Sequence, residues 1–164
     1  MAISQQLYKV QTYSVKFSIK HALGATANGK FSNLVSSIYF EPSNLSLSHI
    51  EATVDANTFY TGNGSRDKHL KGKDYFDAEH FPKIVLKSTT FEKNANEFIG
   101  YFDVTIKGKT KNIKVPFSFT ETESGAKFEG KFEINRLDFG VGGSSFALGD
   151  IATVSILLNT LKNE

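Results

Sequence analysis

The stretch KFEGKFEINR, residues 127–136, alternates apolar and charged residues position by position. One set of alternate positions holds Phe128, Gly130, Phe132 and Ile134, and the other holds Lys127, Glu129, Lys131 and Glu133. Successive side chains of a β-strand point to opposite faces of the sheet. This period of two therefore predicts a strand with one buried face and one face in solvent.

The same period recurs along most of the chain. It is present in residues 14–19, 36–40, 50–56, 83–91, 97–108 and 112–121, and the last segment, residues 151–161, is apolar on both faces. The connecting segments are short, which favours antiparallel neighbours over crossover connections. About eight such strands in up-and-down order close most simply into a barrel, whose interior is either filled by side chains or holds one small ligand. We predict an all-β fold in a single domain that spans residues 1–164.

The composition narrows the range of functions. Apolar residues make up 40% of the chain, there are 15 Phe and no Trp, and there is no Cys. Phe rings must therefore supply much of the core, and disulfides, thiolate metal sites and Cys nucleophiles are excluded. The N-terminal stretch MAISQQLYKV has no charged segment followed by a continuous apolar run, so we predict no signal peptide in this chain. The apolar runs are too short to span a membrane, which predicts a soluble protein.

The charge distribution does not point to a nucleic acid as partner. The formal net charge is +2, and lysines alternate with glutamates on the predicted outer face of residues 127–133. Nucleic-acid binding requires a basic stripe with aromatic residues placed to stack on bases. The one basic run, KGKTKNIK at residues 107–114, is explained by a hairpin turn that lysines keep in solvent.

One stretch, NGSRDKHLKGKDYFDAEHFP at residues 63–82, interrupts the strand pattern. Ser65 as N-cap and Gly72 as a stop predict one short helix, at about residues 65–80 if DYFDAEHFP adds a further turn. The stretch offers oxygen and nitrogen donors at Asp67, His69, Asp74, Asp77 and His80. It contains no pair of His at helical spacing, so caps and salt bridges explain it better than a metal site, and we predict no metal.

Two glycines on the apolar face of the strands leave alternatives open. Gly100 and Gly130 interrupt rows of Phe where a packed core would have a side chain. They let the barrel bend, leave a channel between Phe walls, or do both. The glycine-rich stretch DFGVGGSSF, residues 138–146, lacks the context of a phosphate loop and is interpreted as a loop that can gate an opening.

Several longer motifs closely resemble one known family. They are YSVKFSIKHALGATANGKFSNLVSSIYFEP, TGNGSRDKHLKGKDYFDAEHFPKIVLKSTTF, GYFDVTIKGKTKNIKVPFSF and INRLDFGVGG, in that order between Tyr13 and Leu158. Within them stand Arg66-Asp67-x-His69-Leu70, Asp74-x-Phe76, Pro82, Thr105-Ile106-Lys107-Gly108 and Asn135-Arg136-x-Asp138-Phe139-Gly140. The chain resembles the YceI-like family of bacterial lipid-binding proteins.

This resemblance implies an extended, eight-stranded, lipocalin-like antiparallel barrel with a long apolar pore. Members bind polyisoprenoid-type lipids, such as isoprenoid quinones or polyprenyl chains, and often form dimers, so a bound isoprenoid lipid and a homodimer are expectations here. Many members carry a signal peptide and work in the periplasm. The expected localisation is therefore periplasmic if a leader was removed and cytoplasmic otherwise.

The function expected from these observations is binding of a long-chain amphiphile for transport, storage or sequestration, without catalysis and without a cofactor. The residues that would contact the tail are Phe17, Ile19, Phe31, Ile38, Phe40, Leu86, Phe102 and Phe132. The candidates for the head group at the pore mouth are His21, Arg66, Asp67, His69 and Arg136. The same polar residues can instead form Arg-Asp and His-Asp pairs that hold the helix against the barrel.

Two other functions stay open at this point. A lipid-modifying enzyme would use Asp67, His69 and His80 as acid and base. A purely structural barrel would have a filled interior and no ligand.

Overall fold

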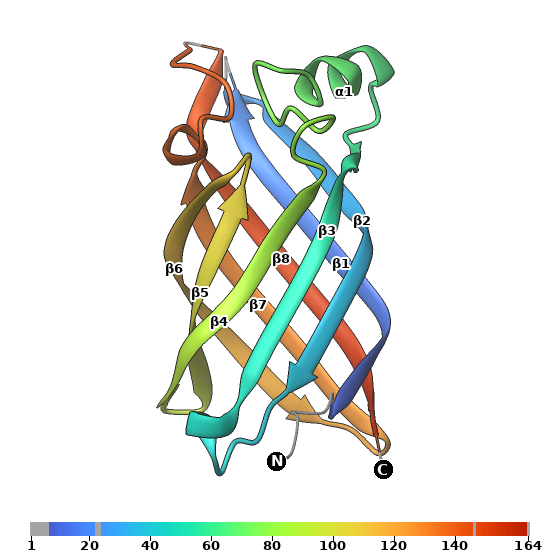
Figure 1. Ribbon diagram of the computed structural model, residues 1–164, viewed down its shortest axis with the longest axis vertical. Helices are drawn as coiled ribbons and strands as arrows, with labels where there is room; N and C mark the ends of the chain where they lie inside the picture. The colour runs from blue at the N-terminus through green and yellow to red at the C-terminus, as the bar shows by residue number, and fades with distance from the viewer. Residues whose placement is uncertain (1–6, 22–23, 146, 164) are drawn as a thin grey trace.

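A computed structural model describes residues 7–21, 24–145 and 147–163. Its strands form one closed barrel in chain order, and β8 pairs with β1 (Figure 1). Every neighbouring pair is antiparallel, so the predicted up-and-down barrel is confirmed. The strands are β1 (Tyr8–His21), β2 (Thr26–Tyr39), β3 (His49–Tyr60), β4 (Lys83–Asn94), β5 (Glu97–Ile106), β6 (Lys109–Glu121), β7 (Gly125–Asn135) and β8 (Leu148–Lys162).

The stretch that predicted the fold is β7, in the wall next to β8. Phe128 and Phe132 are buried, whereas Glu129, Lys131 and Glu133 are exposed. Phe132 lies opposite Val154 of β8, and Phe128 lies opposite Leu158. The apolar face of the alternation is therefore the inner face of the barrel.

One α-helix, α1 (Gly64–Leu70), lies across one end of the barrel, away from the start of β1 and the end of β8 (Figure 1). Its N-cap is Asn63, whose side-chain oxygen accepts a hydrogen bond from the Arg66 amide at 3.0 Å, so the assignment of Ser65 as N-cap was wrong. The helix ends at Leu70, and the rest of the predicted span, through His80, consists of turns. Short 3₁₀ helices, η2 (Leu45–Leu47) and η3 (Arg136–Phe139), complete the fold.

The end of the barrel opposite α1 is filled with aromatic rings. Phe40 is fully buried there, and its ring lies 5.1–5.8 Å from five other Phe rings, mostly edge to face. We call this set the aromatic plug: Phe40, Phe91, Phe98, Phe117, Phe119 and Phe128. Pairs of this geometry each contribute about 0.5–1.5 kcal/mol beyond the area they bury. The plug therefore closes this end of the barrel.

The two strand glycines are closely approached by neighbouring residues. A Cβ added at Gly100 would collide with Phe102 and stand 3.1 Å from the Phe91 ring. A Cβ added at Gly130 would stand 3.3 Å from the Cβ of Phe117. The interpretation of these glycines as sides of an open channel was wrong, because neighbouring side chains occupy the space.

Within the described ranges, no helix is both long and apolar enough to cross a bilayer. Residues 1–6, most of the stretch on which the signal-peptide expectation rests, lie outside these ranges. So does Phe146, at the end of the glycine-rich stretch.

Candidate functional site

The upper part of the barrel, between the aromatic plug and α1, encloses a cavity of about 420 Å³. Its walls are inward-facing apolar side chains of β1, β2, β3, β4, β5, β7 and β8, and its roof is formed by α1 and the segments that follow α1 and η3. This volume is in the range of sites that hold a small organic ligand. The barrel is therefore filled at one end and hollow at the other.

The sizes of the inward-facing residues explain this division. Around the cavity the inner face carries small side chains, including Ala27, Ala52 and Ala152. Ala152 lies opposite Ile19 on one side and Ile134 on the other, so none of these three adjacent positions carries a ring. In the plug, by contrast, the Phe40 ring is surrounded by five other Phe rings.

Aromatic side chains form one wall of the cavity. Phe17 stacks on Phe59 with ring centroids 4.8 Å apart, and Phe31 lies edge-on to Phe76 at 5.7 Å. Phe76 belongs to the segment that follows α1, and it also lies 5.1 Å from Phe59. The aromatic wall therefore holds the roof segment against β2 and β3.

The structure divides the residues predicted for the lipid tail into two groups. Phe17, Ile19, Phe31, Leu86 and Phe132 line the cavity. The other three, Ile38, Phe40 and Phe102, do not. Ile38 and Phe40 are fully buried toward the plugged end, and the Phe102 ring covers Gly100 beside Phe91. We correct their assignment to packing of the filled end.

The polar candidates are likewise divided. His21, Arg66, His69 and Arg136 line the cavity, whereas Asp67 does not. Asp67 is buried and accepts hydrogen bonds from the Thr61 amide at 3.0 Å and from the Thr61 hydroxyl at 2.5 Å. Its carboxylate is therefore occupied in fixing α1 to the end of β3.

Arg66 bonds to the same threonine and not to an acid. Its Nε donates to Thr61 Oγ1 at 2.9 Å, and its Nη2 donates to the Thr61 carbonyl at 3.2 Å. In the described part of the chain Arg66 forms no ion pair, so the expectation that it pairs with Asp was wrong. Side chains adjacent in a helix do not face each other, which is why Arg66 and Asp67 reach Thr61 separately.

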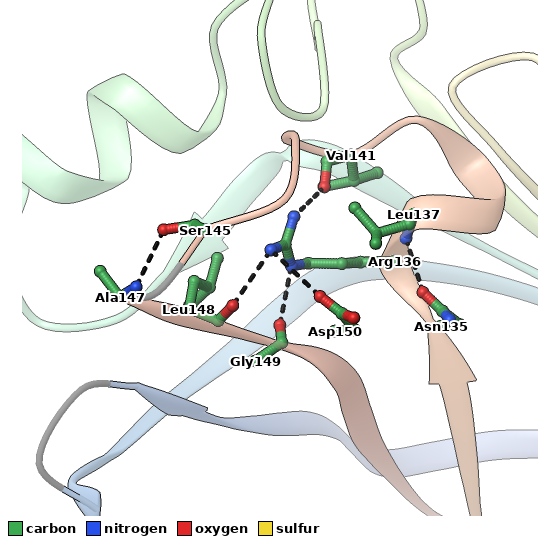
Figure 2. Close-up of polar contacts among 9 residues, drawn as sticks. All are labelled: Asn135, Arg136, Leu137, Val141, Ser145, Ala147, Leu148, Gly149 and Asp150. Atoms are coloured by element: carbon green, nitrogen blue, oxygen red, sulfur yellow. Dashed lines mark hydrogen bonds and ion pairs between the residues drawn. The ribbon is translucent and has the colours of Figure 1, made fainter.

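Arg136 is the second buried charge of this region, with 5% of its surface exposed (Figure 2). Its guanidinium donates to the carbonyls of Gly149 at 2.8 Å, Val141 at 2.9 Å and Leu148 at 3.2 Å. The Asp150 carboxylate lies 3.8 Å from Nη2. Arg136 thus ties η3 to the start of β8 and fixes the segment that roofs the cavity.

The cavity opens to solvent beside these roof segments. His69, Ser145 and Ala147 line the cavity and are also exposed. The His69 ring lies edge-on to Tyr75 at 5.1 Å. Polar residues that line this part of the cavity are His21, Arg66, His69 and Ser145. The Ser145 hydroxyl oxygen accepts a hydrogen bond from the Ala147 amide at 3.0 Å.

Thr61 is the site residue that the sequence analysis missed. It ends the strand pattern at β3 and lines the cavity, and one side-chain hydroxyl serves both Arg66 and Asp67. Nothing in its sequence neighbourhood marks it, because a Thr after a strand is common. Phe59 and Phe76 were also missed as lining residues, although Phe76 is part of the Asp74-x-Phe76 motif and Phe59 lies just before the motif that begins at Thr61.

Asp67, His69 and His80 do not share contacts that would form an acid-base pair. Asp67 bonds to Thr61, His69 packs on Tyr75, and His80 Nδ1 donates to Asp77 at 2.8 Å. That carboxylate raises the pKa of the exposed His80 ring. Among the described residues, no three His, Asp or Glu side chains are close enough to hold a metal ion.

We expect Thr61→Val to destabilise the protein by about 1–3 kcal/mol, because it leaves Asp67 buried with only a backbone donor. The measurement is the free energy of unfolding in urea. Thr61→Ser is the matched control, since it keeps the hydroxyl and should retain most of the stability. A Thr61→Val protein as stable as the unmodified chain would contradict the anchoring role.

Comparison with known proteins places this geometry in a family. A family model described as the YceI-like domain matches residues 8–160. A UPF0312 protein of Yersinia pestis is 27% identical over 106 residues, which are 65% of this chain and 55% of that protein. The aligned region thus spans about half the length of the curated relative.

Solved structures share the fold. BcnA of Burkholderia cenocepacia superposes with a TM-score of 0.86 at 23% identity, over 92% of this chain and 98% of BcnA. The YceI protein of Campylobacter jejuni superposes with a TM-score of 0.76 at 22% identity, over 89% of this chain and 90% of that protein. A polyisoprenoid-binding domain from Saccharophagus degradans superposes with a TM-score of 0.66 at 9% identity, over 96% of this chain and 98% of that domain. The family model matches residues 8–160, which is almost the whole of this chain, so this chain belongs to the YceI-like domain family.

Proposed function

We propose that the barrel binds a long-chain apolar molecule of the isoprenoid type, such as a polyprenyl alcohol or an isoprenoid quinone, with the tail in the cavity. The observation that carries the proposal is an apolar cavity that is closed at one end by the aromatic plug and open at the other beside a few polar groups. Such a shape accepts a chain that has one polar end. The Saccharophagus degradans domain, described as polyisoprenoid-binding, supports the same ligand class.

The tail would bind mainly through removal of its surface from water. Each methylene buried contributes about 0.8 kcal/mol, so a chain gains affinity with length without specific polar contacts. The head would lie near His69 and Ser145, where the cavity opens. Arg136 would act indirectly, by holding the roof, because it is buried and its Nε, Nη1 and Nη2 each donate to a backbone carbonyl.

The test is mass spectrometry of an organic extract from purified, folded protein, followed by binding measurements with geraniol, solanesol and ubiquinone. We expect an isoprenoid chain in near-stoichiometric amount, or uptake of these probes by the emptied protein. An empty extract together with no binding of any probe would overturn the proposal. Localisation, a homodimer and the absence of a nucleic-acid partner stay predictions.

A further inference from the structure

The wall of the barrel is interrupted between β1 and β2, which lie side by side (Figure 1). Tyr8 pairs with Ile38 at one end of the two strands, and the next pair is Val15 with Phe31. Among the described residues, the six of β1 between these pairs, 9–14, have no ladder partner in residues 32–37 of β2. We call these two segments the β1–β2 split.

Both strands carry an irregularity at the split. The register of β1 against β8 shifts between Val10 and Thr12, and that of β2 against β3 shifts between Ser32 and Val35. Asn33 has a φ of 59°, in the left-handed region. A β-bulge bends its own strand and disrupts the hydrogen-bond ladder locally. Since β1 and β2 pair again on either side, the split is part of the wall and not a frayed end.

The split reaches the cavity. Tyr13 lies opposite Leu158, and residues directly opposite in an antiparallel pair share one face of the sheet. Leu158 lines the cavity and is 6% exposed, whereas the Tyr13 side chain on the same face is 38% exposed. Solvent therefore contacts an inward-facing ring at this point of the wall.

Tyr13 bridges the split. Its hydroxyl accepts a hydrogen bond from the Leu34 amide at 3.5 Å, a long contact. Leu34 lines the cavity, and the next residue, Val35, is 66% exposed. At this point the Tyr13 side chain, which can rotate about χ1, takes the place of backbone hydrogen bonds between β1 and β2. It separates the cavity from the exposed Val35.

The aromatic plug blocks the barrel axis at the closed end, so a tail that is longer than the cavity and has its head at the roof cannot continue in that direction. We propose that the β1–β2 split is a side outlet through which the far end of a long chain leaves the barrel, with Tyr13 as its gate. This inference rests on the proposed function. It adds that the size of the cavity does not limit the length of the isoprenoid tail that can bind. It makes Tyr13 and Val35 contacts of the tail in addition to Leu34 and the other residues that line the cavity.

Ser14→Cys/Ser32→Cys tests the outlet. The two serines follow the Val15–Phe31 pair in its register, neither lines the cavity, and the chain has no native Cys. Oxidation therefore yields one disulfide that draws the strands together at the split, and the reduced form of the same variant is its own control. Lys131→Cys/Ser155→Cys, a partner pair in the intact wall between β7 and β8, controls for a disulfide elsewhere in the barrel.

We expect oxidation of Ser14→Cys/Ser32→Cys to weaken solanesol binding by about tenfold or more and to change geraniol binding by less than about twofold. The control pair should show neither change. Equal solanesol affinity in the oxidised and reduced forms would overturn the outlet and leave the proposed function intact. Failure of the unmodified protein to bind either alcohol would instead overturn the proposed function.

A second measurement does not depend on disulfide formation. A solanesol analogue with a photoreactive diazirine at the end of its tail is bound to the unmodified protein, illuminated and mapped by peptide mass spectrometry. Labelling of residues 9–14 or 32–37 would support the outlet. Labelling of the aromatic plug or of the roof segments would overturn it.

Discussion

Phe132→Asp will abolish binding of the proposed isoprenoid ligand while the barrel remains folded. Phe132 is buried, lines the cavity and lies in the middle of β7. An ionised carboxylate there is solvated by water only as long as no apolar tail displaces that water. The penalty for removing this water is about 3 kcal/mol or more, which corresponds to a loss of affinity of about a hundredfold or more.

Two quantities are measured for Phe132→Asp and for Lys131→Asp. They are the amount of isoprenoid ligand retained after purification and the affinity for solanesol. Lys131 is the next residue along the strand and faces outward, so this control places the same carboxylate outside the barrel. Melting curves of both variants establish that they are folded. If a folded Phe132→Asp protein retained its chain, the tail would not lie in this cavity.

A second cavity variant protects the test against misfolding. Ala152→Phe adds an apolar ring at a lining position where the opposing residues are Ile19 and Ile134. It fills space without adding charge, so it should reduce binding of the chain by excluded volume. Full binding in this variant would point to a site elsewhere.

Arg136→Met will have the largest effect on stability. The substitution keeps an apolar stem but removes all of the donors that serve the carbonyls of Val141, Leu148 and Gly149. The expected loss is about 3 kcal/mol, or a melting temperature lower by about 6–12 °C for a chain of this size. The proposed isoprenoid ligand should also dissociate faster, because the roof segment loses its attachment to η3.

Arg136→Lys is the matched control for this prediction. It keeps the charge near Asp150 but cannot reproduce the planar donor geometry of a guanidinium, so its stability should be intermediate. The measurement is thermal unfolding monitored by circular dichroism. An Arg136→Met protein that melts with the unmodified chain would show that the three carbonyls do not depend on this residue.

The barrel was predictable from sequence because the evidence for it is repeated. Each strand has the same period of two, and short turns leave few ways to connect them, so an error in one strand would not have changed the fold. The start of α1 was less certain, because Asn63 and Ser65 are both good N-caps. Asn63 is the N-cap because its side chain accepts a hydrogen bond from the Arg66 amide. Which of the two residues caps the helix depends on the direction in which the backbone leaves β3.

The site was only partly predictable, because periodicity gives the face of a strand but not the height along the barrel axis. Ile38, Phe40 and Phe102 face inward as expected, yet their rings and side chains belong to the filled end. The partners of Arg66 and Asp67 depend on where β3 ends, which sequence spacing does not specify. The break between β1 and β2 has no local signature apart from ordinary polar residues in strands.

The aromatic plug also bears on how such barrels diversify. Since most of the buried ring contacts lie at the closed end, the residues that hold the barrel together are largely distinct from those around the cavity. Exchanges among the small side chains at Ala27, Ala52 and Ala152 can therefore reshape the hollow end without loosening the sealed one. A lineage built in this way can change what it accommodates over evolutionary time while its architecture stays constant.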